Sequence, residues 1–439
     1  MKQNLLNIGE KFIKHELITG SFYIFTGSLI ANIFAFLFNL LLARNLNTVD
    51  YGAYASLLSL FILIGIPAQS ITTVIIKFAA DYFTKNKIDE AKVLYSRLLK
   101  LSIIFSIFIF LGFVLFSISI KEFLNLDNIW YVILTGFIVS INYLGIVNNA
   151  YLQSLLKFSF ISFTQIAGGA LKIAIGGLLV FLGFKVFAAL WAIVLAFLLP
   201  LFFTFIPLRF LINKKKTMDI KFPTKEIIIY ALPTTITILS LNSLTSIDII
   251  LVKHFFHAHD AGLYAGLSLA GKVIFYFTSP IVSVMFPLLI KRHNLGKDYN
   301  SLFYLALILV AIPSIVIMLF YFLFPLLTIN FFLGGREYVE ISPYLGIYGL
   351  FIVVFSLLNV CANFFLSLKK TNVFIIIGLG VLSQIILISA FHRTFFQVIG
   401  VSLIASSVIF IILLAYYFKE YGNFNRIIKA ITFVNNPRN

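Results

Sequence analysis

Two lysines lie deep inside long apolar stretches of the sequence, and of all its residues they are the best placed to do chemistry. Lys272 is about eleven residues from the first residue of the apolar segment 261–290, and Lys172 is about fourteen from that of segment 158–182. A helix rises about 1.5 Å per residue, so Lys272 would lie roughly 16 Å and Lys172 roughly 21 Å from the end of its helix. Neither side chain easily reaches surface water from that depth, so each charge requires a partner or an internal aqueous space.

The surroundings of these lysines leave two interpretations open. No carboxylate in the sequence is obviously placed to neutralise either one, so a water-filled, anion-attracting cavity is one prediction. In the other, each lysine is bonded to backbone carbonyls or reaches an interface through a thinned bilayer. Asp248 is the one acidic residue convincingly inside an apolar segment, and its spacing from Lys253 places the two poorly on one helix face. We therefore expect Asp248 to act across helices, as a partner of Lys272 or as a ligand of a coupling ion.

A repeated motif adds further candidates. The motif begins with Asn or Asp, followed by two apolar residues, Leu, a small apolar residue and Arg or Lys. A short loop and the sequence Asp-x-Gly-x-Tyr complete it. The two copies occupy residues 39–44 with 50–54 and residues 248–253 with 260–264, an offset of 209 and then 210. Arg44 and Lys253 hold equivalent places, where they either point into a cavity mouth or mark the outer interface. Asn39 and Asp248 are also equivalent, and both are candidates for ion coupling.

The composition places all these residues in a membrane protein. Of the 439 residues, 61% are hydrophobic and 11% are charged, whereas a soluble domain is about half apolar and a quarter charged. A membrane span needs about 20 apolar residues. Twelve segments qualify: roughly 18–43, 53–76, 98–120, 129–152, 158–182, 186–211, 226–252, 261–290, 301–327, 343–368, 372–391 and 397–418. We predict an all-α integral membrane protein with about twelve spans.

The distribution of basic residues predicts the orientation of these spans. The net charge of +17 comes from short clusters between apolar runs, which argues against a nucleic-acid partner. Of the 33 Lys and Arg residues, 25 lie in one alternating set of loops and tails, 6 lie in the other, and two lie inside spans. Basic loops face the cytoplasm. Both termini are therefore predicted to be cytoplasmic, with all outer loops short.

The longest predicted inner connections cover residues 77–98 and 212–225. The second holds Lys214–Lys216 and Pro223 near the midpoint of the chain, and it predicts a linker between two six-helix lobes, 1–211 and 226–418, with a cytoplasmic tail at 419–439. A six-helix unit repeated in one orientation implies a pseudo-two-fold axis along the membrane normal.

No constellation of catalytic residues is visible, so we predict a protein that is not an enzyme and has no metal or cofactor. There is no Walker A sequence and no G-x-S-x-G, and the outer-loop His254, His257 and His259 lack the carboxylate or Cys support that a metal site needs. A membrane glycosyltransferase or polysaccharide polymerase would need positioned carboxylates in sizeable outer loops. A structural or receptor protein would leave the two deep lysines unexplained.

The repeated motif, together with Gly334-Gly335-Arg336-Glu337-Tyr338 before the tenth span, resembles polysaccharide (O-antigen type) flippases. These form the Wzx branch of the multidrug/oligosaccharidyl-lipid/polysaccharide exporter superfamily, and the resemblance covers essentially the whole chain. It implies two six-helix lobes around a central cationic cavity. It also implies alternating access that moves a polyprenyl-diphosphate-linked oligosaccharide from the inner to the outer leaflet of the cell (plasma or inner) membrane.

In that resemblance, Lys172, Lys272 and Arg44, with Lys253 as the second-half counterpart of Arg44, would bind the diphosphate. Membrane lipids would be partners, and a polysaccharide polymerase and glycosyltransferases are further candidates. Related lipid-linked peptidoglycan precursor flippases usually carry two more helices, which the sequence lacks. Multidrug extruders of the same superfamily handle cations and usually have a carboxylate in the first helix, where this chain has Asn39 and no acid. A multidrug/cation antiporter is the alternative.

The charge asymmetry generates a test of topology. Green fluorescent protein fused after Asn439 should fluoresce, and alkaline phosphatase at the same point should be inactive, because that enzyme matures only outside the cytoplasm. Phosphatase fused after Gly183, in a predicted outer loop, is the positive control. Active phosphatase at the C-terminus would refute the predicted orientation.

Overall fold

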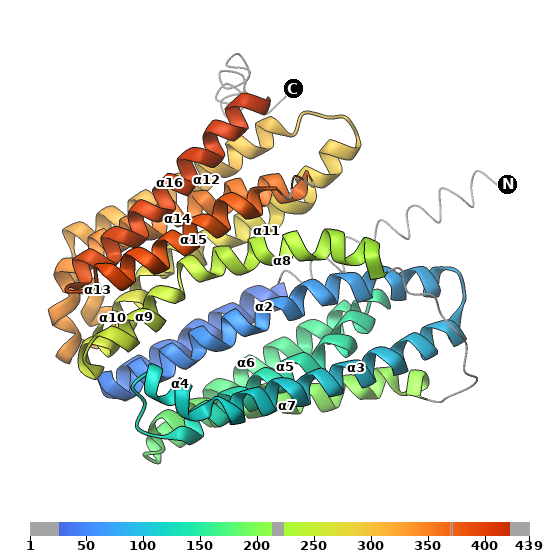
Figure 1. The fold of residues 1–439 in the computed structure, drawn as a ribbon, viewed down its shortest axis with the longest axis horizontal. Helices are drawn as coiled ribbons and strands as arrows, with labels where there is room; N and C mark the ends of the chain where they lie inside the picture. The colour runs from blue at the N-terminus through green and yellow to red at the C-terminus, as the bar shows by residue number, and fades with distance from the viewer. Residues whose placement is uncertain (1–25, 213–223, 369, 371, 422–439) are drawn as a thin grey trace. The chain divides into compact units, whose positions relative to one another are not determined.

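The chain folds as a bundle of membrane-length helices. The structure is a computed structural model that describes residues 26–212, 224–368, 370 and 372–421, and within these ranges it contains helices and turns and no strand (Figure 1). Among the described residues, eleven helices are long and apolar enough to cross a membrane, and a bent pair, 232–244 with 247–255, brings the number to twelve when it is counted as one span. The predicted all-α, twelve-span fold is confirmed. The basic N-terminal segment, most of the linker and the tail from residue 422 lie outside the described residues.

The helices follow one another in the same order in the two halves of the chain. The first half contains Thr26–Asn45, α2 (Thr48–Thr84), α3 (Ile88–Leu115), α4 (Ser117–Phe123), α5 (Ile129–Ser154), α6 (Phe158–Phe181) and α7 (Lys185–Ile212). The second half contains α8 (Thr224–Leu244), α9 (Ile247–Phe255), α10 (Ala258–Gly271), α11 (Val273–Asn294), α12 (Asn300–Leu323), α13 (Pro325–Leu333), the 3-10 helix η1 (Arg336–Ile341), α14 (Ser342–Ser367), α15 (Val373–Ala390) and α16 (Phe395–Tyr421).

The long inner connection predicted over residues 77–98 is wrong. In the structure α2 continues to Thr84 and α3 already begins at Ile88. Both helices continue beyond their apolar parts into segments rich in charged residues. Ion pairs between nearby residues stabilise these ends, as between Lys85 Nζ and Asp81 Oδ1 at 2.8 Å. Hydropathy therefore located the spans but not the polar ends of the helices.

The helices group into two compact units. Unit 1 consists of Met1–Leu46 and Ile64–Ala231, and unit 2 consists of Asn47–Leu63 and Leu232–Asn439. The grouping differs from the predicted lobes 1–211 and 226–418 in that residues 47–63, the N-terminal part of α2, belong to unit 2, and unit 1 runs on to Ala231. The helix α2 thus belongs partly to each unit.

The two units have the same internal packing. In unit 1, α5 packs against α3 and α7, and α6 packs against α7. In unit 2, α14 packs against α12 and α16, and α15 packs against α16. A short helix, α4 or α13, follows the third span of each half. The repeat detected in the sequence therefore extends to the tertiary structure of each unit, whereas the predicted symmetry axis stays a prediction.

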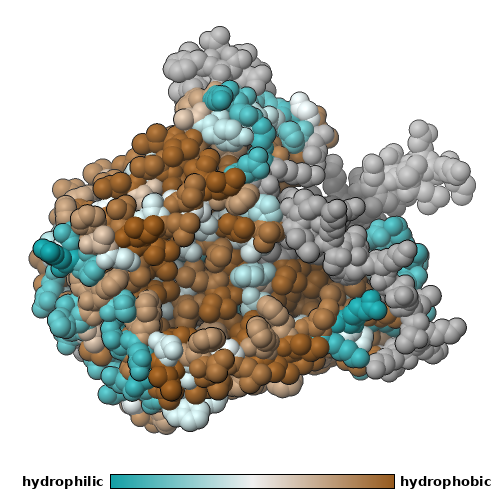
Figure 2. All heavy atoms as spheres, in the orientation of Figure 1, coloured by the Kyte–Doolittle hydropathy of each residue, from teal (hydrophilic) through white to brown (hydrophobic). Residues whose placement is uncertain are grey.

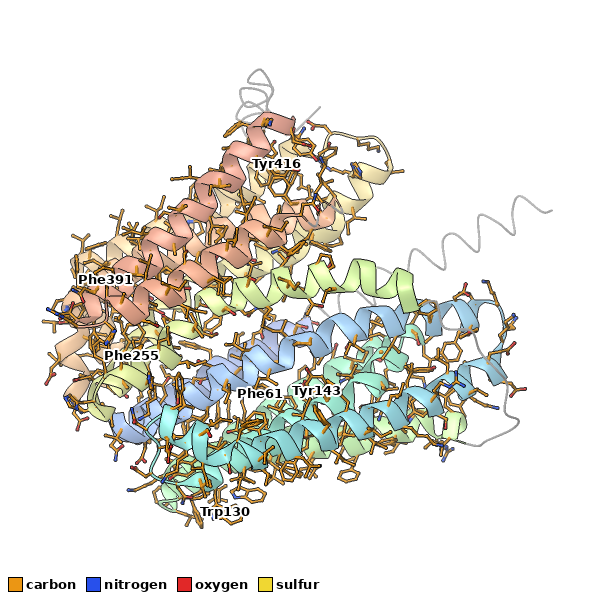
Figure 3. The ribbon with its side chains drawn as sticks, viewed as in Figure 1. Phe61, Trp130, Tyr143, Phe255, Phe391 and Tyr416 are labelled. Carbon is orange, nitrogen blue, oxygen red and sulfur yellow. The ribbon has the colours of Figure 1, made fainter. Side chains whose placement is uncertain are left out.

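The outer surface of the helices suits a lipid environment. Large hydrophobic side chains are widely exposed, such as Phe181 at 89% and Phe108 at 71% of their surface. Hydrophobic residues cover much of the view in Figure 2, and hydrophilic residues gather mainly near helix ends. Trp130, at the start of α5, projects outward (Figure 3), where the amphipathic ring of an aromatic residue suits the membrane–water interface.

The repeated glycines explain why the motif occurs twice. A Cβ atom on Gly52 would lie 2.8 Å from the backbone N of Gly262, and one on Gly262 would lie 1.8 Å from the carbonyl oxygen of Thr48. The start of α2 therefore touches α10 through its backbone, within unit 2. Small residues permit such close helix packing in membranes. The Asp-x-Gly-x-Tyr parts of the two copies, at 50–54 and 260–264, pack against each other within unit 2.

This contact predicts a stability effect. Gly262→Ala should lower the melting temperature of the purified protein, because the added methyl group meets a backbone carbonyl and overpacking costs about 1–3 kcal/mol. The control is Gly400→Ala in α16, whose Cβ would meet nothing within 4 Å. Alanine favours a helix over glycine, so this variant should melt at or above the wild-type temperature. Fluorescence-detected gel filtration after heating would measure both, and equal melting temperatures would contradict the contact.

Candidate functional site

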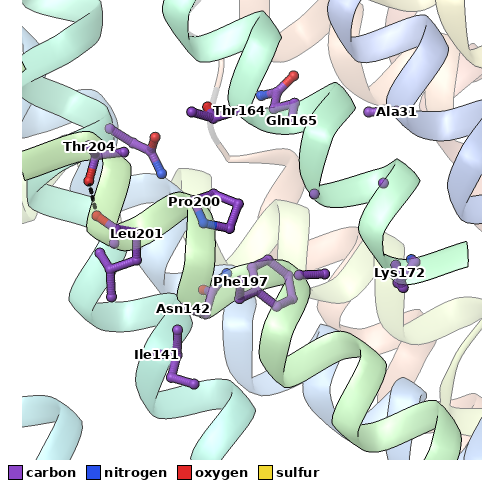
Figure 4. Close-up of a pocket in the computed structure, with 15 residues that line it drawn as sticks. Ala31, Ile141, Asn142, Thr164, Gln165, Lys172, Phe197, Pro200, Leu201 and Thr204 are labelled. Carbon is purple, nitrogen blue, oxygen red and sulfur yellow. Dashed lines mark hydrogen bonds between the residues drawn. The ribbon is translucent and has the colours of Figure 1, made fainter. Parts of the chain in front are cut away.

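Unit 1 contains a cavity of about 330 Å³ within its own helices. Its lining comes from α5, α6, α7 and Ala31 of the first helix (Figure 4). In Figure 4, Lys172 lies at one side of the cavity and Thr204 lies at the other, with Phe197 and Pro200 between them. The cavity therefore joins one of the two deep lysines to the polar residues of neighbouring helices.

Proline and glycine residues shape this cavity. Pro200 has no N–H group, so the carbonyl of Ala196, four residues earlier in α7, has no donor in the regular helical pattern. A Cβ on Gly168 would lie only 2.9 Å from that carbonyl oxygen, and one on Gly169 would lie 2.9 Å from the Phe34 side chain. The helix α6 thus runs close to α7 and to the first helix. Ala196, with its carbonyl, belongs to the cavity lining.

Lys172 is the one cation of the cavity lining. Its Nζ lies 4.9 Å from the centre of the buried Phe38 ring, a cation–π contact of moderate strength. It makes no ion pair with any residue that the structure describes. A lysine that lacks a carboxylate partner in the middle of an apolar bundle makes the cavity attractive to an anion.

The asparagines of α5 divide into two groups. Asn148 is fully buried: its Oδ1 accepts a hydrogen bond from the Tyr95 hydroxyl at 2.8 Å, and its Nδ2 donates to Thr204 Oγ1 at 2.8 Å. Asn142 and Asn149 line the cavity, and within the described part of the chain neither side chain makes a hydrogen bond. Asn148 holds helices together, whereas Asn142 and Asn149 are available to a ligand.

Unit 2 holds the second deep lysine at a pair of helix interruptions. The seventh span bends by 48° between α8 and α9, and Lys272 directly follows the last residue of α10. Lys272 Nζ donates a hydrogen bond to the carbonyl of Thr245 at 2.5 Å, inside the bend. Gln384 Nε2 donates to the carbonyl of Leu244 at 3.1 Å. These side chains supply the donors that the interrupted helix cannot supply itself.

Asp248 lies beside this bend, in the first turn of α9, and is fully buried. Its Oδ2 accepts a hydrogen bond from the Tyr264 hydroxyl at 2.9 Å, and the Tyr348 hydroxyl lies 3.4 Å away. Among the described residues, no ion pair of 4.0 Å or less joins Asp248 to Lys272. The other carboxylate oxygen, Oδ1, is buried without a hydrogen bond to any described residue. Both residues thus lie at the bend, where Lys272 binds the Thr245 carbonyl and Asp248 binds Tyr264, and their direct partnership stays a prediction.

The remaining candidates have different surroundings. Arg44 is exposed at the end of the first helix, whereas its sequence counterpart Lys253 is 2% exposed in α9. Asn39 Nδ2 donates to the carbonyl of Ala35 in its own helix at 2.7 Å. The roles of these three residues in substrate binding or ion coupling stay predictions, and so does a direct contact of Lys272 with substrate.

One of the three outer-loop histidines, His259, takes part in a hydrogen-bonded cluster. Thr48 Oγ1 lies 2.8 Å from His259 Nδ1 and donates to Glu337 Oε2 at 2.9 Å. These contacts connect the starts of α2, α10 and η1, next to the paired glycines. Among the described residues, no group of three or more His, Cys, Asp or Glu side chains could hold a metal ion.

Comparison with known proteins now adds the family. The profile of polysaccharide biosynthesis proteins matches residues 16–343. The chain belongs to this family. An uncharacterised membrane protein of Methanocaldococcus jannaschii is 26% identical to it over 88% of this chain and 99% of its own length.

Solved structures show the same fold. An inward-facing multidrug resistance transporter of the MATE family, in the MOP superfamily, superposes with a TM-score of 0.69 at 16% identity, over 88% of this chain and 93% of its own. The lipid II flippase MurJ, in an inward closed conformation, gives a TM-score of 0.67 at 17% identity, over 91% and 87%. This family member therefore has the fold of MOP-superfamily transporters, and it is a multi-pass membrane protein.

The pair in unit 2 predicts an energetic coupling. Lys272→Met and Asp248→Asn should each destabilise the protein, because each weakens hydrogen bonds of a buried charged group at the bend, worth about 1.5–3 kcal/mol each. The double variant should lose less than the sum of the two, by at least about 1 kcal/mol. Unfolding of the purified variants would measure this coupling. The exposed Lys297→Met, combined with Asp248→Asn, is the additive control. Additive effects for the Lys272 pair would contradict the interaction.

Proposed function

We propose that this protein is a transporter that moves a polyprenyl-diphosphate-linked oligosaccharide from the cytoplasmic to the outer leaflet of the cell membrane by alternating access. Its family and its fold support the coarser statement, a membrane transporter of the MOP superfamily that serves polysaccharide synthesis. The proposal adds the substrate and the direction, with both termini cytoplasmic. Glycosyltransferases would supply the cargo, and a polymerase would consume it.

The single observation that carries the proposal is the position of Lys172. A cation without a described ion-pair partner lines a polar cavity between apolar helices, where an anionic head group would replace the water that solvates it. A lysine ammonium is a compact point charge that suits a phosphate. In this proposal Arg44 and Lys253 attract the diphosphate near the outer ends of the spans.

We assign to unit 2 the task of coupling substrate transport to an ion or to the membrane potential. Asp248, with one unbonded carboxylate oxygen, is the group that would take up a coupling ion, and Lys272 competes with that ion for the carboxylate. An ion can shift the conformational equilibrium only if it binds one state more tightly. Lys272 would thus act through the bend between α8 and α9, and any contact with substrate would come in addition.

A multidrug/cation antiporter is the alternative, because the multidrug transporter superposes well. The cavity of unit 1 disfavours it. A cationic drug would meet Lys172, and no carboxylate contributes to the lining.

Transport by purified protein in liposomes tests the proposal. Wild-type protein should move a fluorescent polyprenyl-diphosphate-linked oligosaccharide across the bilayer, measured by its cleavage by an externally added glycosidase. Lys172→Ala should reduce the rate about tenfold or more, Lys172→Arg should retain part of it because the charge remains, and Lys172→Glu should be lowest. Lys121→Ala in α4 is the control. The same series at Lys272 should also lose transport, provided that melting temperatures confirm folding.

Two outcomes would refute the proposal. In one, wild-type liposomes fail to move the lipid-linked oligosaccharide while they exchange a cationic dye against protons or sodium, as an antiporter would. In the other, Lys172→Ala and Lys172→Glu transport at the wild-type rate with normal stability, so that the charge in the cavity is irrelevant.

A further inference from the structure

We propose that the cavity of unit 1 is a carbohydrate subsite, which binds the membrane-proximal sugar of the cargo through amide groups while Lys172 binds the adjoining phosphate. This inference rests on the proposed function, and it adds recognition of the sugar itself. A purely electrostatic site would need only cations, whereas most polar groups of this cavity are neutral.

The first argument concerns the two asparagines of the cavity lining whose side chains make no hydrogen bond to described residues. Asn142 and Asn149 present side-chain amides to the cavity, and neither has a hydrogen-bond partner among the described residues. Asn142 is half-buried and Asn149 is exposed, so both amides are accessible to water or to a ligand in the cavity. Each amide offers two donor hydrogens and an acceptor oxygen, which matches neighbouring hydroxyl groups of a sugar ring.

The second argument is the supply of acceptors opposite these amides. The Thr164 and Thr204 hydroxyls donate to carbonyls of their own helices, at 2.8 Å to Ile161 and 2.6 Å to Leu201, so toward the cavity they can only accept. Thr204 Oγ1 already accepts one hydrogen bond from Asn148, which leaves it one further lone pair. Ala196, whose carbonyl loses its regular donor to Pro200, belongs to the same lining. An anion alone has no hydrogens for these oxygens. A ligand that both donates and accepts several hydrogen bonds satisfies the whole lining.

The third argument is shape. A volume of about 330 Å³ is at the lower end of the range of small-molecule sites, about 300–1,000 Å³, so the cavity suits a small ring system and excludes a long oligosaccharide. Phe197 supplies an apolar wall beside the polar groups (Figure 4), which suits the C–H face of a sugar. Because Lys172 belongs to the same lining, one ligand can place a sugar against the amides and a phosphate against the ammonium.

Binding of short-chain probes to the purified protein tests this assignment. The probes are farnesyl diphosphate and farnesyl diphosphate that carries one glucose, galactose or N-acetylglucosamine. Wild-type protein should bind at least one sugar-bearing probe about tenfold more tightly than farnesyl diphosphate, the effect of one or two net hydrogen bonds. Asn142→Leu and Asn149→Leu should abolish this gain and leave the affinity for farnesyl diphosphate unchanged. Lys172→Gln should weaken both classes of probe alike.

The matched control is Gln153→Leu, one turn beyond Asn149 in α5 and outside the cavity lining, which should keep the full sugar-dependent gain. Should a leucine variant fail to fold, Asn142→Ser and Asn149→Ser remove the amide without adding apolar surface. The inference is overturned if no sugar raises affinity in the wild type, or if the asparagine variants weaken both classes of probe equally. Transport without a sugar-dependent gain refutes the subsite alone, and a gain without transport refutes the proposed function alone.

Discussion

The requirement that every backbone carbonyl find a donor inside an apolar environment governs this structure. Continuous helices meet it automatically, but an interrupted helix leaves carbonyls that only side chains, water or a ligand can satisfy. In unit 2 the bend of the seventh span is satisfied from within, by Lys272 and Gln384. In unit 1, Pro200 inside α7 deprives the carbonyl of Ala196, a residue of the cavity lining, of its regular helical donor. In unit 2, side chains thus satisfy the carbonyls at the bend, whereas unit 1 has a cavity with room for a ligand.

This contrast suggests how two copies of one ancestral fold divide their tasks. The helix order and the internal packing are the same in both units, but the deep lysines differ. Lys272 is bound to the Thr245 carbonyl at the bend, whereas Lys172 touches an aromatic ring and lines a cavity. The equivalent Arg44 and Lys253 likewise differ, one exposed and one buried. In our proposal the first unit binds the cargo, and the second couples the conformational change.

The sequence alone predicted the spans, because runs of apolar residues report directly on lipid contact. It also predicted the internal repeat, and the comparisons support the family that its motifs resembled. The polar ends of α2 and α3 were missed, since hydropathy carries no signal for helices that extend into water. The repeated glycines were recognised as a motif, but their mutual contact depends on tertiary packing.

The candidate site was only partly predictable. The depth of Lys172 and Lys272 followed from counting residues, whereas their partners depend on helix rotation, which one sequence does not define. Asn142, Asn148 and Asn149 look alike in the sequence, and only the structure separates the one that links helices from the two in the cavity. The sequence analysis did not use Pro200, although its position inside the predicted span 186–211 was the available signal.

The most direct test of the central claim is a cryo-electron microscopy structure of the protein in lipid nanodiscs with a polyprenyl-diphosphate-linked sugar bound. The account predicts density for the sugar inside unit 1, beside Asn142 and Asn149, with a phosphate within hydrogen-bond distance of Lys172 Nζ. A head group bound elsewhere, with the cavity of unit 1 filled only by water, would contradict it.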